Sequence, residues 1–266
     1  MELCSIASGS SGNCIYVGTQ STHLLVDVGI SGKRTENGLN SLGLTGRDLD
    51  GILITHEHSD HVSGLGVLSR KYHIPIYATE GTIRAIRNSS SLGKIEEELF
   101  IPIQADNSFT VKDIVVNPMR TSHDAGEPVA YRFRHGKQKM AIATDLGTYN
   151  DYTVECLKGM DVLFLEANHD VNMLQVGPYP YALKQRILGD RGHLSNERSG
   201  QLLKRILHDG LQAVILGHLS KENNLPELAY ETVRIELVMG AKGCPGNEFP
   251  ITVAKRDEVS PRICIA

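Results

Sequence analysis

Short apolar runs alternate with amphipathic stretches along most of this chain. Residues 51–54 and 213–216, for example, have the length and composition of buried strands. Apolar residues in 80–88 and 181–188 recur instead at the spacing of a helix. Strands come first, helices then alternate with them, and this order occurs twice. The pattern predicts an α/β (α+β) protein in which residues 1–266 form a single domain: a four-layer αββα sandwich of two mixed sheets packed face to face, with helices outside.

The same pattern places the other elements. Further strands are predicted at 3–7, 14–18, 24–29, 76–78, 114–117, 129–135, 139–143 and 161–166, with others in 96–119 and 249–265. Further helices are predicted at 65–72, 195–208 and 225–239, and residues 31–43 form a short helix or a turn region. Four apolar residues after the strand at 51–54 have the spacing of a helix's inner face: Val62, Leu65, Val67 and Leu68. The loop containing Pro178 and Pro180 is expected to lie over a cleft.

The composition is that of an ordinary soluble globular protein. The chain has 266 residues, of which 41% are hydrophobic and 22% charged. Its net charge of −4 gives no overall attraction to nucleic acid. No apolar run approaches the roughly 18 residues of a membrane span, so no membrane partner is expected.

The ends and the cysteines indicate a cytoplasmic protein. The first residues lack the basic flank and apolar core of a signal peptide. The five cysteines are widely scattered and form no Cys-x-x-Cys pair, which is typical of reduced, buried thiols. Any bound metal is therefore expected to be held by histidine and acidic side chains. The five cysteines that this excludes as ligands are Cys4, Cys14, Cys156, Cys244 and Cys264.

Three histidines and an aspartate crowd together directly after the strand at 51–54. His56 and His58 are two residues apart, so in extended backbone their imidazoles point the same way and can reach one cation. Asp60 and His61 fall at the entrance of the next helix, where they can face a second cation. Imidazole and carboxylate together suit Zn, Mn or Fe better than Ca or Mg. The sequence therefore predicts two divalent transition metal ions at the end of this strand.

The alternative is that these histidines cap a helix or lie on the surface. Three of the eleven histidines stand here beside an acid, and if protonated together they would repel one another. A metal removes that repulsion, which favours the metal site. The spacing of two residues distinguishes the cluster from the helical His-Glu-x-x-His pattern.

Other histidines and aspartates also follow apolar strands. Strand ends on one edge of a sandwich converge, so distant residues can complete the two cation sites. The first cation would take His56, His58 and His123, the second would take Asp60, His61 and His218, and Asp145 would bridge them. Asp27 follows the strand at 24–29, where it either caps a turn or orients a ligand histidine.

These residues lie in motifs that resemble those of a known superfamily. His-x-His-x-Asp-His, followed by later His, Asp and His, resembles the metallo-β-lactamase superfamily over the whole chain. A closer resemblance is to the YycJ/WalJ family of bacterial metal-dependent nucleases. The motifs that carry it are Ala7-Ser8-Gly9-Ser10-Ser11-Gly12-Asn13, His56-Glu57-His58-Ser59-Asp60-His61, Glu166-Ala167-Asn168-His169-Asp170, Gly192-His193-Leu194-Ser195-Asn196 and His218-Leu219-Ser220-Lys221-Glu222-Asn223-Asn224.

The resemblance implies a dinuclear metal-dependent phosphodiesterase, a DNA exonuclease acting 5′ to 3′. In such an enzyme two cations about 3.5–4 Å apart share a water and lower its pKa. The resulting bridging hydroxide attacks phosphorus in line, the metals offset the growing charge, and Asp60 can orient the hydroxide. DNA is then the expected partner.

The resemblance also suggests how the leaving oxygen gains its proton. In similar tRNA 3′-processing endonucleases a histidine in a Gly-His-Ser context, at the start of a helix, supplies it. His193 holds the matching position, and the alternative is that it caps its helix. Asn13, His169 and Asn223 are further candidates for contact with phosphate or with ligand histidines. The loop at 8–13 either approaches an anion through its amides or is a plain flexible hairpin.

Two other functions stay open from the sequence. One is hydrolysis of a small ester, thioester or cyclic phosphodiester, and the other is a catalytically silent metal-binding protein with a signalling role. The length leaves no room for the inserted domain or arm with which related nucleases grip their substrates. Basic residues form only a loose scatter: Lys184, Arg186, Arg191, Arg198 and Lys204.

Overall fold

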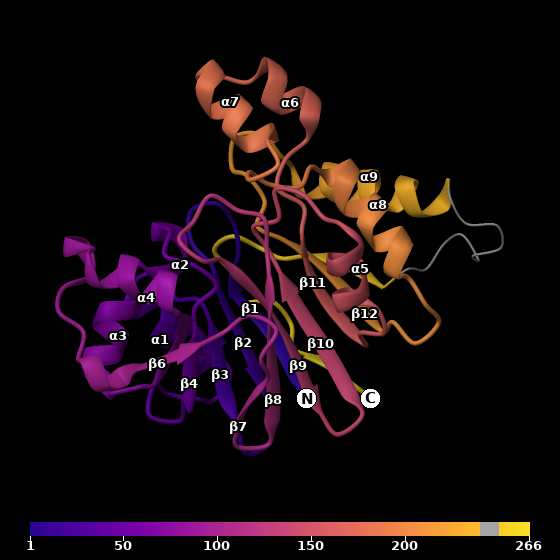
Figure 1. Cartoon of the computed structure of the whole chain (residues 1–266). Helices are drawn as coiled ribbons and strands as arrows, with labels where there is room; N and C mark the ends of the chain where they lie inside the picture. Colours follow the sequence, from indigo (N-terminus) through magenta and orange to yellow (C-terminus); the bar gives the residue numbers. More distant parts are fainter. Residues whose placement is uncertain (240–249) are drawn as a thin grey trace.

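Two seven-stranded sheets pack face to face within the residues described by this computed structural model, which are 1–239 and 250–266 (Figure 1). Helices cover the outer face of each sheet. The four-layer αββα sandwich predicted from the sequence is confirmed.

The first sheet is built mainly from the amino-terminal part of the chain. Its strand order is β14-β1-β2-β3-β4-β5-β6. Strands β3 to β6 run parallel, whereas β1 pairs antiparallel with β2 and with β14. The bounds are β1 (Glu2–Ala7), β2 (Cys14–Gly18), β3 (His23–Val26), β4 (Gly51–Leu53), β5 (Ile76–Thr79), β6 (Phe100–Ile103) and β14 (Ile263–Cys264).

The second sheet has the order β13-β12-β11-β10-β9-β8-β7. Strands β10 to β13 run parallel, so their carboxyl ends meet at one edge, while β7 to β10 are antiparallel. The bounds are β7 (Phe109–Val111), β8 (Ile114–Arg120), β9 (Val129–His135), β10 (Gln138–Ala143), β11 (Val162–Glu166), β12 (Ala213–Gly217) and β13 (Ile251–Val253).

The helices divide between the two outer layers and one projecting arm. The first sheet is covered by α1 (Gly32–Ser41), α3 (Leu65–Tyr72) and α4 (Glu80–Arg87), with the short α2 (Ser59–Val62) at its end. The second sheet is covered by α5 (Asp151–Leu157), α8 (Asn196–Ile206) and α9 (Pro226–Val238). Helices α6 (Val171–Val176) and α7 (Tyr181–Leu188) stand away from the layers as a helical hairpin (Figure 1), and 3-10 turns lie at Ser90–Leu92 and Glu97–Leu99.

Apolar side chains fill three layers, one between the sheets and one under each set of helices. Successive residues of a strand point to opposite faces, so a strand covered on both faces must be apolar at every position. Leu24 and Leu25 show this: both are fully buried, Leu24 between the sheets and Leu25 under the helices. The short, continuously apolar strands of the sequence therefore arise from burial on both faces.

One predicted helix face is wrong. Val67 is 53% exposed, although the spacing placed it inward with Leu65 and Leu68. Helix α2 ends at Val62 and α3 begins at Leu65, so Val62 lies in a different helix from Leu65, Val67 and Leu68. In α3, Leu65 and Leu68 are nearly one turn apart and share a face, while Val67 is rotated to the other side.

Some boundaries also differ from the prediction. Strand β3 ends at Val26 because Asp27 adopts a left-handed conformation, with φ 61°. Helices α5 and α6 were not predicted. In the tail, Phe249 and Cys244 lie outside the described residues, while β13 and β14 account for the predicted strand-like runs. Among the ranges 1–239 and 250–266, no helix has the length and apolar character needed to cross a membrane.

Candidate metal centre

The centre lies where strands of both sheets end. Asp27 follows β3, His123 follows β8, Asp145 follows β10 and His218 follows β12. Asp27, Asp145 and His218 have positive φ values of 61°, 58° and 56°. Such values are uncommon for residues other than glycine and persist where the surrounding structure holds them. Three of these side chains are therefore presented from tightly constrained turns at strand ends.

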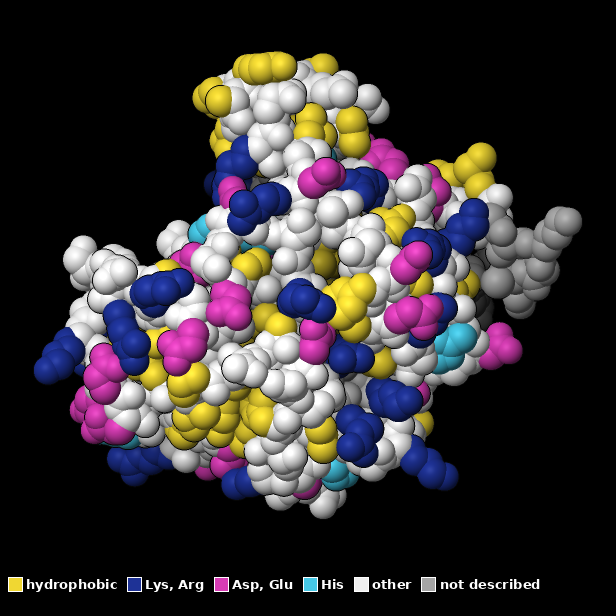
Figure 2. Space-filling model, viewed as in Figure 1, with side chains coloured by type: hydrophobic (Ala, Val, Ile, Leu, Met, Phe, Trp, Pro, Cys, Tyr) yellow, Lys and Arg dark blue, Asp and Glu magenta, His cyan; other side chains and the backbone are white. Residues whose placement is uncertain are grey.

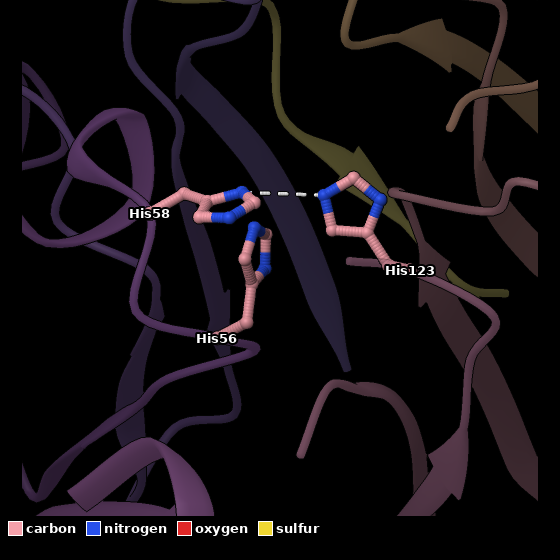
Figure 3. A group of neighbouring side chains, drawn as sticks. All are labelled: His56, His58 and His123. Carbon is pink, nitrogen blue, oxygen red and sulfur yellow. Dashed lines mark hydrogen bonds between the residues drawn. The ribbon is translucent and has the colours of Figure 1, made fainter. Parts of the chain in front are cut away.

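His56, His58 and His123 form the first cluster (Figure 3). Their ligand-type nitrogens all lie within 4.8 Å of one another. His58 Nδ1 is 3.3 Å from His123 Nε2, although the two residues come from different sheets. The Nδ1 of His123 lies 3.0 Å from the carbonyl oxygen of Gly192, an arrangement in which Nδ1–H donates and Nε2 is left with a lone pair facing the cluster.

Asp60, His61 and His218 form the second cluster. His61 Nε2 is 3.3 Å from Asp60 Oδ2, and His218 Nε2 is 3.6 Å from the same oxygen. The other ring nitrogen of His61 donates to Asp27, whose Oδ2 is 2.7 Å away. Asp27 in turn accepts hydrogen bonds from the amide and hydroxyl of Thr55. A fixed carboxylate thus holds His61 with Nε2 toward the cluster.

Asp145 lies between the two clusters. Its Oδ1 is 3.6 Å from His123 Nε2, in the first cluster. Its Oδ2 is 3.4 Å from His61 Nε2 and 3.1 Å from His218 Nδ1, in the second. One buried carboxylate therefore contacts both groups of imidazoles.

Buried His56 Nε2 lacks a hydrogen-bond partner in the described part of the chain, and Asp145 Oδ2 and His218 Nδ1, although 3.1 Å apart, are not aligned for a regular hydrogen bond. Buried polar atoms without partners are rare in proteins and costly. Cations held by imidazole nitrogens and carboxylate oxygens would satisfy them, and this donor set suits transition metals. The buried His and Asp clusters are thus consistent with a dinuclear metal site.

The charges of the cluster favour cation binding. Burial, together with nearby His61, holds the pKa of His56 well below its usual range, which keeps that imidazole neutral. Burial acts against ionisation of Asp60, but His61 lowers the pKa of Asp60 to about 2. Burial alone would also lower the pKa of His61, yet Asp145 and Asp60 raise it well above its usual range. Without a cation, the centre therefore combines a neutral His56 and a charged Asp60 with a protonated His61, which must release its proton when a cation binds.

His193 adjoins the clusters and is held by Glu166. Its Nδ1 is 2.7 Å from Glu166 Oε1. The other oxygen of Glu166 accepts from the amides of Leu146 and Leu194, at 2.8 and 3.1 Å. Ser195, rather than His193, caps helix α8 through its side chain. Sequence reasoning gave Glu166 no role, although an acid closing an apolar strand was the signal that had singled out Asp145.

The three remaining candidates lie outside the clusters. Asn13 Nδ2 is 3.3 Å from His61 Nε2, so Asn13 borders the second cluster. His169 is buried next to Asn168, with burial lowering its pKa to about 4. Asn223 donates to the hydroxyl of Ser220. The structure thus brings Asn13 to the centre but not His169 or Asn223.

Comparison with known proteins identifies relatives over nearly the whole chain. A family model for the beta-lactamase superfamily domain matches residues 22–218. Exodeoxyribonuclease WalJ of Streptococcus pneumoniae is 42% identical over 256 residues, which cover 96% of this chain and 95% of that protein. Exodeoxyribonuclease YycJ of Bacillus anthracis is 43% identical over 228 residues, or 86% of each chain.

Solved structures share the fold. Zn²⁺-bound PqqB of Methylobacterium extorquens has a TM-score of 0.73 at 15% identity. The superposition covers 98% of this chain and 100% of the PqqB chain. The short form of human tRNase Z has a TM-score of 0.66 at 18% identity, with 100% of both chains covered. Fold and site together define a metal-dependent hydrolase. The chain belongs to the beta-lactamase superfamily and, within it, to the family of WalJ and YycJ.

Proposed function

We propose that this protein is an exodeoxyribonuclease that hydrolyses DNA phosphodiester bonds in the 5′ to 3′ direction. The observation that carries the proposal is the presence of two adjoining His/Asp clusters in a chain with 42% identity to WalJ over 95% of that relative. The 5′ to 3′ direction follows the family resemblance noted in the sequence motifs.

In this proposal each cluster holds one cation. His56, His58 and His123 hold the first, Asp60, His61 and His218 the second, and Asp145 contacts both. The donor set favours Zn, Mn or Fe. When bound, such a pair of cations supplies water of lowered pKa and offsets the negative charge that grows on the phosphate.

Different side chains are proposed to act on the attacking water and on the leaving oxygen. Asp60 is charged and partly exposed, so it can orient the attacking water. His193 is proposed to give a proton to the leaving oxygen from Nε2, because Glu166 engages its Nδ1. The Glu166 carboxylate accepts the hydrogen bond from Nδ1–H and so orients the imidazole with Nε2 free.

A nuclease assay with matched histidine variants tests the proposal. Single- and double-stranded oligonucleotides, labelled at either end, are incubated with the protein while its metal content is measured on the same sample. We expect stepwise release of nucleotides from the 5′ end. His58→Ala should abolish cleavage while the protein stays folded. His73→Ala should have no effect, since the side chain of His73 is 61% exposed and belongs to neither cluster.

Unchanged turnover in His58→Ala would reject the assignment of the centre. Hydrolysis of acyl thioesters or lactones without cleavage of any phosphodiester would reject the nuclease and favour a small-ester hydrolase.

A further inference from the structure

The pocket that opens onto the metal centre has two unlike walls. One wall is polar and consists of side chains of the centre together with Ser10, Asn168 and Ser220. The other comes from the α6–α7 hairpin and presents Tyr179, Leu183 and Ile187, together with Arg186, whose charge is paired with Asp124. An aromatic ring and two aliphatic side chains therefore line the same pocket as the ligand-type groups. A molecule with a charged part and an apolar part would match this lining.

The apolar wall is fixed relative to the centre. At the start of the hairpin, the amide of Asp170 donates to the carbonyl of Asn223 across 2.9 Å. At its end, the amide of His193 donates to the carbonyl of Ile187 across 3.0 Å. On α7 itself, Arg186 pairs through Nε and Nη2 with the two carboxylate oxygens of Asp124, the residue next to His123 in the chain. Such multiple anchoring holds the hairpin's inner side chains in place before a substrate arrives.

Two tyrosines of the hairpin occupy different positions. Tyr179 is half-buried and lines the pocket. Tyr181, two residues later, is 77% exposed and is not among the lining residues. Apolar side chains gather on the outer end of the projecting arm, whereas Lys and Arg side chains lie where the arm joins the body (Figure 2). Tyr181 can therefore serve as a control for Tyr179, because both lie in the α6–α7 hairpin and only Tyr179 lines the pocket.

We propose that Tyr179 is a specificity-determining residue that stacks on the base of the nucleotide being removed. The inference rests on the proposed nuclease function. A nucleotide has the two parts that match this lining, since its phosphate can lie against the polar wall while its base lies against the hairpin. Stacking on an aromatic side chain is a common way of holding a base without selecting its sequence. Leu183 and Ile187 complete the apolar surface beside the ring.

The test compares two end-labelled oligonucleotides that differ only in their terminal nucleotide, which carries a base in one and is abasic in the other. We expect the wild type to cleave the first with a kcat/KM about tenfold higher, an ordinary effect for one stacked base. Tyr179→Ala should lower kcat/KM on the natural oligonucleotide about tenfold and leave the abasic one unchanged. Tyr179→Phe keeps the ring and should retain the preference, and Tyr181→Ala should behave as wild type.

A Tyr179→Ala protein that still prefers the natural terminus would overturn the inference and leave the nuclease function intact. So would a Tyr181→Ala protein that loses the preference to the same extent, because the effect would then not belong to the pocket. Thermal unfolding and metal content of each variant establish that folding and the centre are unchanged. A wild type that cleaves neither oligonucleotide would overturn the proposed function, and this inference with it.

Discussion

Glu166 Oε1 accepts a hydrogen bond from His193 Nδ1 across 2.7 Å, joining the last residue of β11 to the segment that leads into α8. Glu166 is fully buried, and two backbone amides fix its second oxygen. The imidazole is therefore held in one orientation, with Nε2 left as the nitrogen for the pocket that His193 lines.

The hydrogen bond between Glu166 and His193 predicts how substitutions of these two residues change kcat. His193→Ala should lower kcat by about 10²–10⁴-fold, the usual contribution of a positioned acid. Glu166→Gln should lower kcat by a smaller factor, and the double variant should lose little more than His193→Ala, because Glu166 acts through His193. Steady-state kinetics on DNA measure all three.

A substrate with an acidic leaving group provides the control. A p-nitrophenyl ester of thymidine phosphate releases a phenolate that needs little help from a proton donor. The loss in His193→Ala should therefore be much smaller on this ester than on DNA. An equal loss on both substrates would assign His193 to metal or phosphate binding instead.

Asp27 is predicted to act through His61. In the wild type, His61 Nδ1–H donates to the Asp27 carboxylate across 2.7 Å. Asp27→Asn replaces this carboxylate by an uncharged amide, and the imidazole becomes a weaker metal ligand. We expect the affinity for the second cation to fall by about 10–100-fold, the usual effect of removing such a partner. Competition with a chromogenic chelator measures the affinity. Asp113→Asn is the matched control, since that carboxylate is also held by threonine hydroxyls but belongs to no cluster.

Asp113 links the turns at the far end of the two sheets and should contribute to stability against acid. Burial is the largest single influence and opposes its ionisation, but the hydroxyls of Thr22, Ser21 and Thr19 together outweigh it and lower its pKa from 3.8 to about 2. A carboxyl whose pKa is lower in the folded state adds stability that is present above pH 3.8 and is lost as the pH falls toward 2.

Denaturant unfolding of Asp113→Asn checks this pH dependence. The variant should be less stable than wild type at pH 5 to 7, and the difference should shrink between pH 5 and pH 3. A difference that stays constant over this range would show that the charge of Asp113 is not what stabilises the turns.

Cation binding should stabilise the folded protein. A cation bound at 100 times its Kd adds about 2.7 kcal/mol, or roughly 5–10 °C in Tm for a chain of this size. Adding Zn²⁺ or Mn²⁺ to metal-free protein should produce such a shift in a single transition if residues 1–266 fold as one domain. The shift should be smaller in His58→Ala, which loses a ligand of the first cluster but none of the second, and unchanged in His73→Ala. Equal shifts in both variants would indicate binding elsewhere.

The sequence was sufficient for the parts of the fold that depend on local pattern. Strands such as β11 and β12 are buried on both faces, so their apolar runs are continuous and easily recognised. Val67 was misplaced because a residue two positions after Leu65 lies on the opposite side of the helix, although its apolar side chain matched the expected inner face. Helix α6 was missed because it packs little apolar surface, with only Leu174 buried.

The ligand-type residues could be predicted because each follows a strand, and strand ends converge. The structure adds relations that spacing cannot give. Glu166 is one example, since its partner His193 lies 27 positions away and only the folded chain brings them together. Tyr179 is another, because nothing in its local sequence distinguishes a pocket tyrosine from the exposed Tyr181.

Anomalous diffraction from crystals grown with Zn²⁺ or Mn²⁺ tests the central claim most directly. The account predicts two peaks: one among His56, His58 and His123, one among Asp60, His61 and His218, with Asp145 in contact with both. A single peak, or metal bound only outside these clusters, would contradict it.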